Sequence, residues 1–127
     1  EGRYADAETE LRSVIGAQEK AIGPDHPSTL YSRDDLAETL RQEGRCAEAE
    51  TGFRAVLAAR EKVLGTEHPD TLRTCFRLSR CLKTEGRIPD AKVVARRAAE
   101  GARTVLGPDH VDTKKYEALW QELQSSS

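Results

Sequence analysis

The sequence predicts an all-α solenoid of antiparallel helix pairs, and two segments that recur at one fixed interval predict it. The first runs Gly65-Thr66-Glu67-His68-Pro69-Asp70-Thr71-Leu72, and near copies of it lie 42 residues earlier, at 23–30, and 42 residues later, at 107–113. The second runs Gly44-Arg45-Cys46-Ala47-Glu48-Ala49-Glu50 and returns at 2–8 and at 86–92. Three copies without insertion or loss are typical of proteins built from stacked supersecondary units.

Six helices are expected, in the order B-A-B-A-B-A, where B and A denote the two helices of a unit. The B-type helices cover residues 3–22, 45–64 and 88–106, and the A-type helices cover about 27–42, 69–84 and 111–124. Apolar residues recur at helical spacing in each of them. Gly23 and Gly65 suit left-handed C-terminal caps, and Pro27 and Pro69 suit a first helical turn. No segment shows the alternation of a β-strand.

We interpret residues 1–127 as a single repeat domain of three 42-residue units, at 2–43, 44–85 and 86–127. The chain does not begin with methionine and enters the repeat at its second residue. We therefore expect it to be a fragment of a longer array.

Composition excludes several classes of function. The chain has 20 Lys and Arg against 22 Asp and Glu, a formal net charge of −2, which argues against broad affinity for nucleic acid or for an anionic membrane. It contains no apolar run near the ~18 residues that a membrane span needs, and no signal segment. A cytoplasmic location is expected.

Several residues resemble the helix-packing signature of the tetratricopeptide repeat: Leu36-Ala37, Leu40, Gly44, Ala49 and Phe53. The period and the connectors are similar to the kinesin-light-chain type of that repeat, which is also common in bacterial signalling proteins. HEAT and armadillo repeats have similar periods but different connectors. The resemblance implies a right-handed superhelix in which the A-type helices line a concave groove that grips extended peptides of partner proteins.

The sequence departs from this family at the residues that hold the peptide backbone. Helix A usually carries an Asn pair before the Leu-Ala, whereas this chain has Asp34-Asp35, Phe76-Arg77 and Ala118-Leu119, and no Asn anywhere. Neither a kinesin-light-chain cargo nor any other named ligand can be transferred to it.

The reactive residue types do not form a catalytic or metal-binding pattern. His26, His68 and His110 stand at equivalent places in successive units, which two helix-packing distances of ~8–10 Å separate, so they are expected to start helices and not to share a metal. Cys46, Cys75 and Cys81 lack zinc-site spacing and are expected to be packing thiols. We expect no cofactor, no metal and no enzymatic activity.

The A-type helices differ in charge along the expected groove. The first presents Tyr31, Asp34, Asp35 and Glu38, and the second presents Arg73, Phe76, Arg77 and Arg80. Two interpretations stay open: the charges neutralise each other across the seam between units, or they bind a peptide that is acidic at one end.

The function expected from these features is that of a non-catalytic scaffold that binds an extended peptide in the groove. The alternative is a sensor or regulatory segment of a larger bacterial signalling ATPase. Weak self-association is also expected through apolar residues left uncovered on the two terminal helices: Tyr4, Leu11, Val14, Leu119, Trp120 and Leu123.

Overall fold

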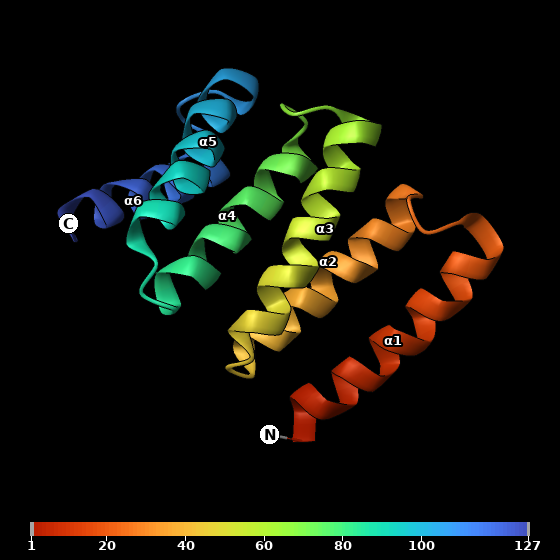
Figure 1. Ribbon diagram of the computed structural model, residues 1–127. Helices are drawn as coiled ribbons and strands as arrows, with labels where there is room; N and C mark the ends of the chain where they lie inside the picture. The colour runs from red at the N-terminus through yellow and green to blue at the C-terminus, as the bar shows by residue number, and fades with distance from the viewer. Residues whose placement is uncertain (1, 127) are drawn as a thin grey trace.

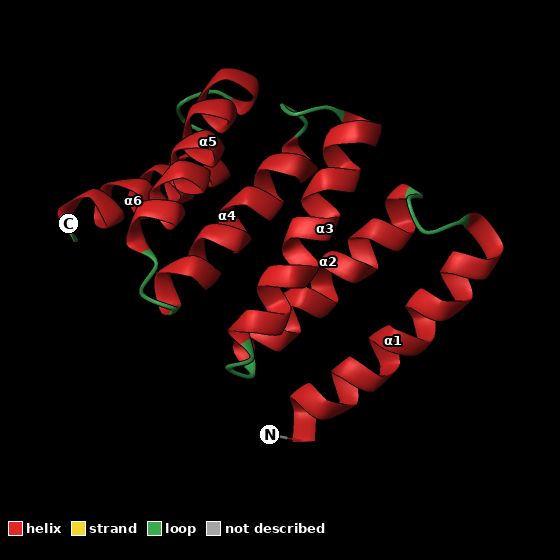
Figure 2. Ribbon diagram, viewed as in Figure 1, coloured by secondary structure: helices red, strands yellow, loops and turns green. Residues whose placement is uncertain are grey.

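A computed structural model describes residues 2–126 and shows six α-helices stacked in chain order (Figure 1). They are α1 (Gly2–Ile22), α2 (Pro27–Gln42), α3 (Cys46–Leu64), α4 (Pro69–Thr84), α5 (Ile88–Leu106) and α6 (Val111–Ser125). Short turns join them, and residues 2–126 contain no strand (Figure 2). Each helix packs against the next one along the chain. The predicted solenoid of antiparallel helix pairs is confirmed.

A histidine caps each A-type helix at its first turn. The imidazole Nδ1 of His26, His68 and His110 accepts a hydrogen bond from the backbone N–H two residues later, at 3.0–3.1 Å. This bond satisfies one of the amide groups that a helix start leaves unpaired. The helix before ends at a glycine such as Gly65, whose φ of 96° disfavours any side chain. The histidines therefore start helices, as the sequence predicts.

The main core cluster extends from α2 to α6 and contains the three cysteines. Phe53 of α3 and Leu72 of α4 are fully buried within it. Cys46, Cys75 and Cys81 are free and buried, and burial raises the pKa of the Cys75 thiol to about 11. They behave as small apolar residues of the core, in agreement with the sequence prediction.

Helix α5 packs closely because its inward face is small. Its buried residues are alanines and one glycine, Gly101. A Cβ atom at Gly101 would lie 2.6 Å from Cδ2 of the buried Leu72 and 3.1 Å from its Cδ1. The glycine therefore lets α4 and α5 approach more closely than alanine would allow.

Two glycine substitutions should have opposite effects on stability. Gly16 of α1 has open space around it, so Gly16→Ala should raise the free energy of unfolding by about 0.5–1 kcal/mol through helix propensity alone. Gly101→Ala should lower it by about 1–3 kcal/mol because Leu72 must move within a packed core. Urea unfolding followed by circular dichroism measures both. Equal stabilisation by the two alanines would contradict the close contact.

The structure corrects the prediction for the terminal helices. Leu119 and Leu123 of α6 are only 7% and 0% exposed, because they share the inward stripe of Tyr116 and join the core. At the other end Val14 is exposed, as expected, whereas Tyr4 and Leu11 are partly buried. Trp120 is also partly buried and packs against the core. The uncovered apolar surface is therefore smaller than the sequence pattern indicates.

Candidate functional site

The predicted groove residues lie on α2 and α4, which are adjacent in the stack, but they do not all reach the surface. Asp34 is buried, with 1% exposure. Phe76 is buried at 7%, while Tyr31 is exposed. The others are partly exposed: Asp35, Glu38, Arg73, Arg77 and Arg80.

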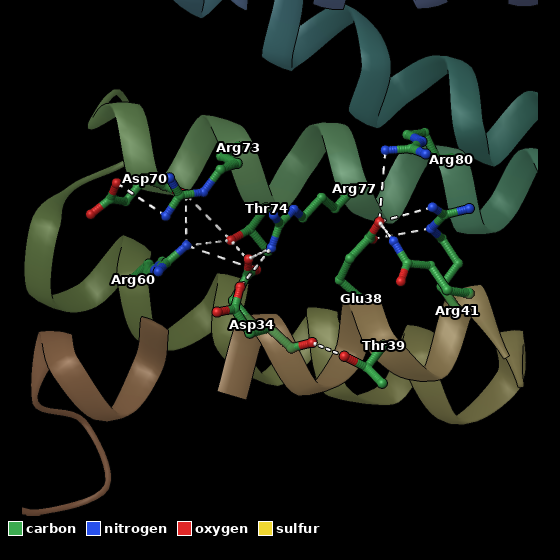
Figure 3. A network of polar contacts seen from close by, with 12 residues as sticks. Asp34, Glu38, Thr39, Arg41, Arg60, Asp70, Arg73, Thr74, Arg77 and Arg80 are labelled. Atoms are coloured by element: carbon green, nitrogen blue, oxygen red, sulfur yellow. Dashed lines mark hydrogen bonds and ion pairs between the residues drawn. The ribbon is translucent and has the colours of Figure 1, made fainter. Parts of the chain in front are cut away.

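Asp34 is the centre of a buried polar network that joins three helices (Figure 3). The Thr74 hydroxyl of α4 donates to its Oδ1 at 3.0 Å and accepts from Nη1 of Arg60 on α3 at 2.8 Å. Arg60 is 1% exposed and also donates to the Asp70 carbonyl at 2.9 Å. Its guanidinium lies 3.8 Å from Asp34. Burial holds the pKa of Arg60 below the ordinary value for arginine, and the nearby Asp34 carboxylate opposes this shift.

Arg77 closes the network from the groove side. Its Nη1 donates to Oδ2 of Asp34 and lies 3.4 Å from Oδ1 of Asp35. Burial alone would lower the pKa of Arg77, but Asp34 and the other carboxylates outweigh it and raise the pKa. The Arg77 charge is thus largely neutralised across the seam between α2 and α4.

Arg80 is held more loosely than Arg77. Glu38 of α2 accepts two hydrogen bonds from Arg41 of the same helix, at 3.0 and 2.8 Å, and lies 3.8 Å from Arg80. Burial opposes ionisation of Glu38, yet the Arg41 bonds outweigh it and lower the pKa of the carboxyl. Because Arg41 takes both carboxylate oxygens, Arg80 keeps a side chain that is 38% exposed.

Arg73 and Tyr31 meet near the start of the A-type helices. The Arg73 guanidinium lies over the Tyr31 ring, 5.4 Å from its centroid, and 3.4 Å from Asp70 of its own helix. This is a cation–π contact at a partly exposed place. The Arg73 charge is therefore engaged with the Tyr31 ring and with Asp70.

A positively charged hollow of about 470 Å³ lies beside Arg80, between α4 and α6. Phe76 forms part of its wall: its ring stacks on Tyr116 at 4.7 Å, with Arg80 and Lys115 at 5.4 and 5.3 Å from its centroid. Burial raises the pKa of Tyr116 to about 12, so its hydroxyl stays neutral. The lining residues are Arg41, Phe76, Arg80, Lys83, Thr84, Lys115, Ala118, Leu119 and Glu122.

The hollow has more positive than negative charge. Lys83 pairs with Glu122 across it, and Arg41 is taken up by Glu38. Lys115 is exposed and has no carboxylate partner among the described residues. Arg80 and Lys115 are thus the cations most available to an anion that enters here.

The network joins α2, α3 and α4, and the equivalent junction one unit later joins α4, α5 and α6. This second junction lacks the buried charges. Forty-two residues after Asp34, Arg60, Thr74 and Arg77, the chain carries Phe76, Ala102, Tyr116 and Leu119. The stack of Phe76 on Tyr116 stands where Asp34 accepts from Thr74 at the first junction. Equivalent positions at the two junctions therefore carry different chemistry.

Sequence reasoning missed Arg60, Lys83 and Lys115. Arg60 had a signal, since it interrupts the apolar stripe Phe53, Val56, Leu57 at helical spacing. Lys115 is equivalent to Tyr31 and Arg73, and register alone would have placed it on the same face. Nothing in the pattern indicated Lys83, whose role depends on the approach of α6.

Residues 2–126 contain no group of three or more histidine, cysteine or carboxylate side chains placed to bind a metal ion. No helix within this part of the chain has the length and hydrophobicity to cross a bilayer.

Comparison with known proteins identifies the class. The family model of the tetratricopeptide repeat matches residues 1–51 and 33–104. The chain belongs to the tetratricopeptide repeat family, whose members act as scaffolds for protein interaction and are generally non-catalytic. No curated protein sequence matches the chain at a significant level.

Two solved structures share the fold. The first is a putative kinesin light chain from Podosopora anserina with nearly identical TPR-like repeats: its TM-score is 0.90 at 24% identity, over 98% of this chain and 59% of that one. The second is a glutamine-to-methionine variant of the same protein, with a TM-score of 0.88 at 24% identity, over 96% and 57%. The chain thus spans less than two thirds of the length of these structures. The resemblance to kinesin-light-chain repeats is confirmed at the level of the fold.

Proposed function

We propose that the face formed by α2, α4 and α6 binds an extended acidic peptide of a partner protein. The hollow between α4 and α6 carries this proposal, because two available cations, Arg80 and Lys115, flank the apolar wall formed by Phe76. An acidic side chain beside an apolar one would match this arrangement. Arginine suits the role because its planar fork binds carboxylates bidentately.

The charges of α2 would set the direction of the peptide. Asp35 and Glu38 lie across the seam from the hollow and repel an acidic segment, although Arg77 and Arg41 partly neutralise them. The acidic end of the peptide would therefore lie toward α6 and a neutral or basic end toward α2. Tyr31 and Arg73 would contact the chain near the start of the helices.

Asp34 and Arg77 contribute indirectly. Asp34 is buried and Arg77 is engaged with it, so their role in the proposed site is to hold α2 against α4 at a fixed distance. The site spans few units, so we expect micromolar affinity at best, and strong weakening by salt.

A peptide-array screen followed by fluorescence anisotropy tests the proposal. Arg80→Glu should weaken the selected acidic peptides by about tenfold or more, because a favourable contact becomes a repulsive one. Lys114→Glu is the matched control: it lies on α6, is exposed, does not line the hollow and should change affinity less than about twofold. Circular dichroism checks that both variants fold. If the selected peptides bind the Arg80→Glu variant as tightly as they bind the unaltered protein, the proposal is wrong. The charged residues of α2 and α4 would then serve only to join the two helices.

A further inference from the structure

The hollow between α4 and α6 is bounded by two helices that face each other within the stack. The lining residues of α4 are Phe76, Arg80, Lys83 and Thr84, and those of α6 are Lys115, Ala118, Leu119 and Glu122. Each set recurs at helical spacing, so it occupies one face of its helix. Lys83 and Glu122 pair from opposite sides. The hollow therefore lies between described residues of this chain on both sides.

The charged side chains around the hollow leave a surplus of two positive charges. The lining contains one carboxylate, Glu122, and four cations, namely Arg41, Arg80, Lys83 and Lys115. Glu122 neutralises Lys83, and Glu38 of α2 neutralises Arg41 by accepting two hydrogen bonds from it (Figure 3). Arg80 and Lys115 are the two cations that remain.

One aromatic ring holds both of these cations. The Arg80 guanidinium lies 5.4 Å and the Lys115 ammonium 5.3 Å from the centroid of Phe76. This ring is itself fixed, because it is 7% exposed and stacks on Tyr116. The two charges thus come from different helices and lie beside the same small piece of apolar surface.

The surroundings of Arg80 favour an added anion. Burial lowers the pKa of Arg80, and the like charges of Arg41 and Arg77 lower it further, while Glu38 opposes them. Arginine nevertheless keeps its proton in proteins. Its positive charge therefore lies in an unfavourable environment, which a negative group in the hollow would relieve.

We propose that the hollow binds a phosphorylated serine or threonine side chain of the partner peptide, with the phosphate between Arg80 and Lys115. This inference rests on the proposed function and names the acidic group that enters the site. A carboxylate brings one negative charge, whereas a phosphate monoester brings about −1.5 to −2 at pH 7 and three acceptor oxygens. The phosphate can therefore match the surplus charge and contact both cations with different oxygens.

A phosphopeptide fits this place better than a nucleic acid does. Asp35 and Glu38 of α2 lie on the same groove side as the hollow, and the chain has a net charge of −2. A row of backbone phosphates would meet these carboxylates, and its affinity depends on many cations. A single phosphate on an otherwise uncharged peptide needs only Arg80 and Lys115.

A blocked dipeptide, acetyl-leucyl-phosphoserine amide, is the probe for this inference. It has no terminal charges, and its controls carry glutamate or unmodified serine in place of phosphoserine. Each compound is titrated into the nitrogen-15-labelled full chain, and the shifts of the Arg80 and Lys115 amide signals give the dissociation constant. The phosphoserine probe should bind roughly tenfold more tightly than the glutamate probe. The serine probe should not bind measurably.

The pH dependence of binding separates phosphate from carboxylate. The second pKa of a phosphate monoester is about 6, so its dianion forms between about pH 5 and about pH 7.5. Across this range the affinity of the phosphoserine probe should rise about fivefold. The glutamate probe is largely ionised throughout, since the pKa of its side chain is about 4.3. Titration of a protein group would alter the binding of both probes alike.

A variant at Lys115 tests whether both cations are needed. Lys115→Gln should reduce the preference for phosphoserine over glutamate from about tenfold to about threefold or less. Lys114→Gln is the matched control, because Lys114 is exposed and does not line the hollow, so the preference should stay unchanged. Circular dichroism checks that both variants fold.

Several results would overturn the inference. Equal binding of the phosphoserine and glutamate probes, or a preference that survives Lys115→Gln, would exclude a phosphate site but leave the acidic-peptide groove, which the Arg80→Glu variant tests separately. Inorganic phosphate that binds as tightly as the phosphoserine probe would assign the hollow to a free anion. A short single-stranded oligonucleotide that binds more tightly than the probe would assign it to nucleic acid.

Discussion

Replacing Arg60 with alanine is expected to lower the free energy of unfolding by about 3–5 kcal/mol, as is found when one partner of a buried ion pair is removed. Arg60 is 1% exposed, and Asp34 beside it is equally buried. The substitution leaves the Asp70 carbonyl without this donor and removes a positive charge from beside Asp34. Urea unfolding followed by circular dichroism at 222 nm measures the loss.

Two further variants separate the buried network from ordinary surface charge. Arg54→Ala, on the same helix, removes an exposed i,i+4 pair with Glu50 and should cost only about 0–1 kcal/mol. Arg60→Met combined with Asp34→Leu removes both buried charges and should cost less than the sum of the single changes, because neither of these two groups is left without the other and Arg77 keeps Asp35 as a partner. A loss for Arg60→Ala no larger than that for Arg54→Ala would contradict the role given to the network.

Replacing Phe53 with alanine should cost a similar amount, about 3–5 kcal/mol, for a different reason. Phe53 is fully buried in α3 and belongs to the core cluster that contains Ala37, Ala49 and Leu72. The substitution opens a cavity that small neighbours cannot fill. Val93→Ala, at a residue 72% exposed, is the control and should change stability by less than about 0.5 kcal/mol. Similar effects of the two changes would show that α3 relaxes around the gap.

The interval between copies made the architecture predictable from sequence. Equivalent residues recur every 42 positions, so one well-patterned helix such as α3 identifies its counterparts even where α5 is poor in large apolar residues. The helix boundaries follow from glycine and proline, whose backbone preferences are local. The histidine caps were located for the same reason.

The candidate site was less predictable because it depends on contacts between helices. Register placed Asp34 and Arg77 on the groove side, but it could not show that Asp34 points beneath the surface toward Arg60. Nor could it show that Tyr116 covers one face of Phe76. Which charges neutralise each other is set by distances of a few ångströms between helices, and those distances depend on the packing of the whole stack.

The contrast between the two junctions bears on how such a chain can be rearranged. The first junction is held by residues from both units: Asp34 from the first, and Arg60, Thr74 and Arg77 from the second. The residues of one unit therefore stabilise the junction only when their partners in the other unit are present. Their equivalents Phe76, Ala102, Tyr116 and Leu119 are apolar or aromatic, and such surfaces tolerate substitution by others of similar volume. Recombination or protein engineering should therefore exchange the third unit as an interchangeable module. The first two are better treated as one indivisible block that must be inherited together.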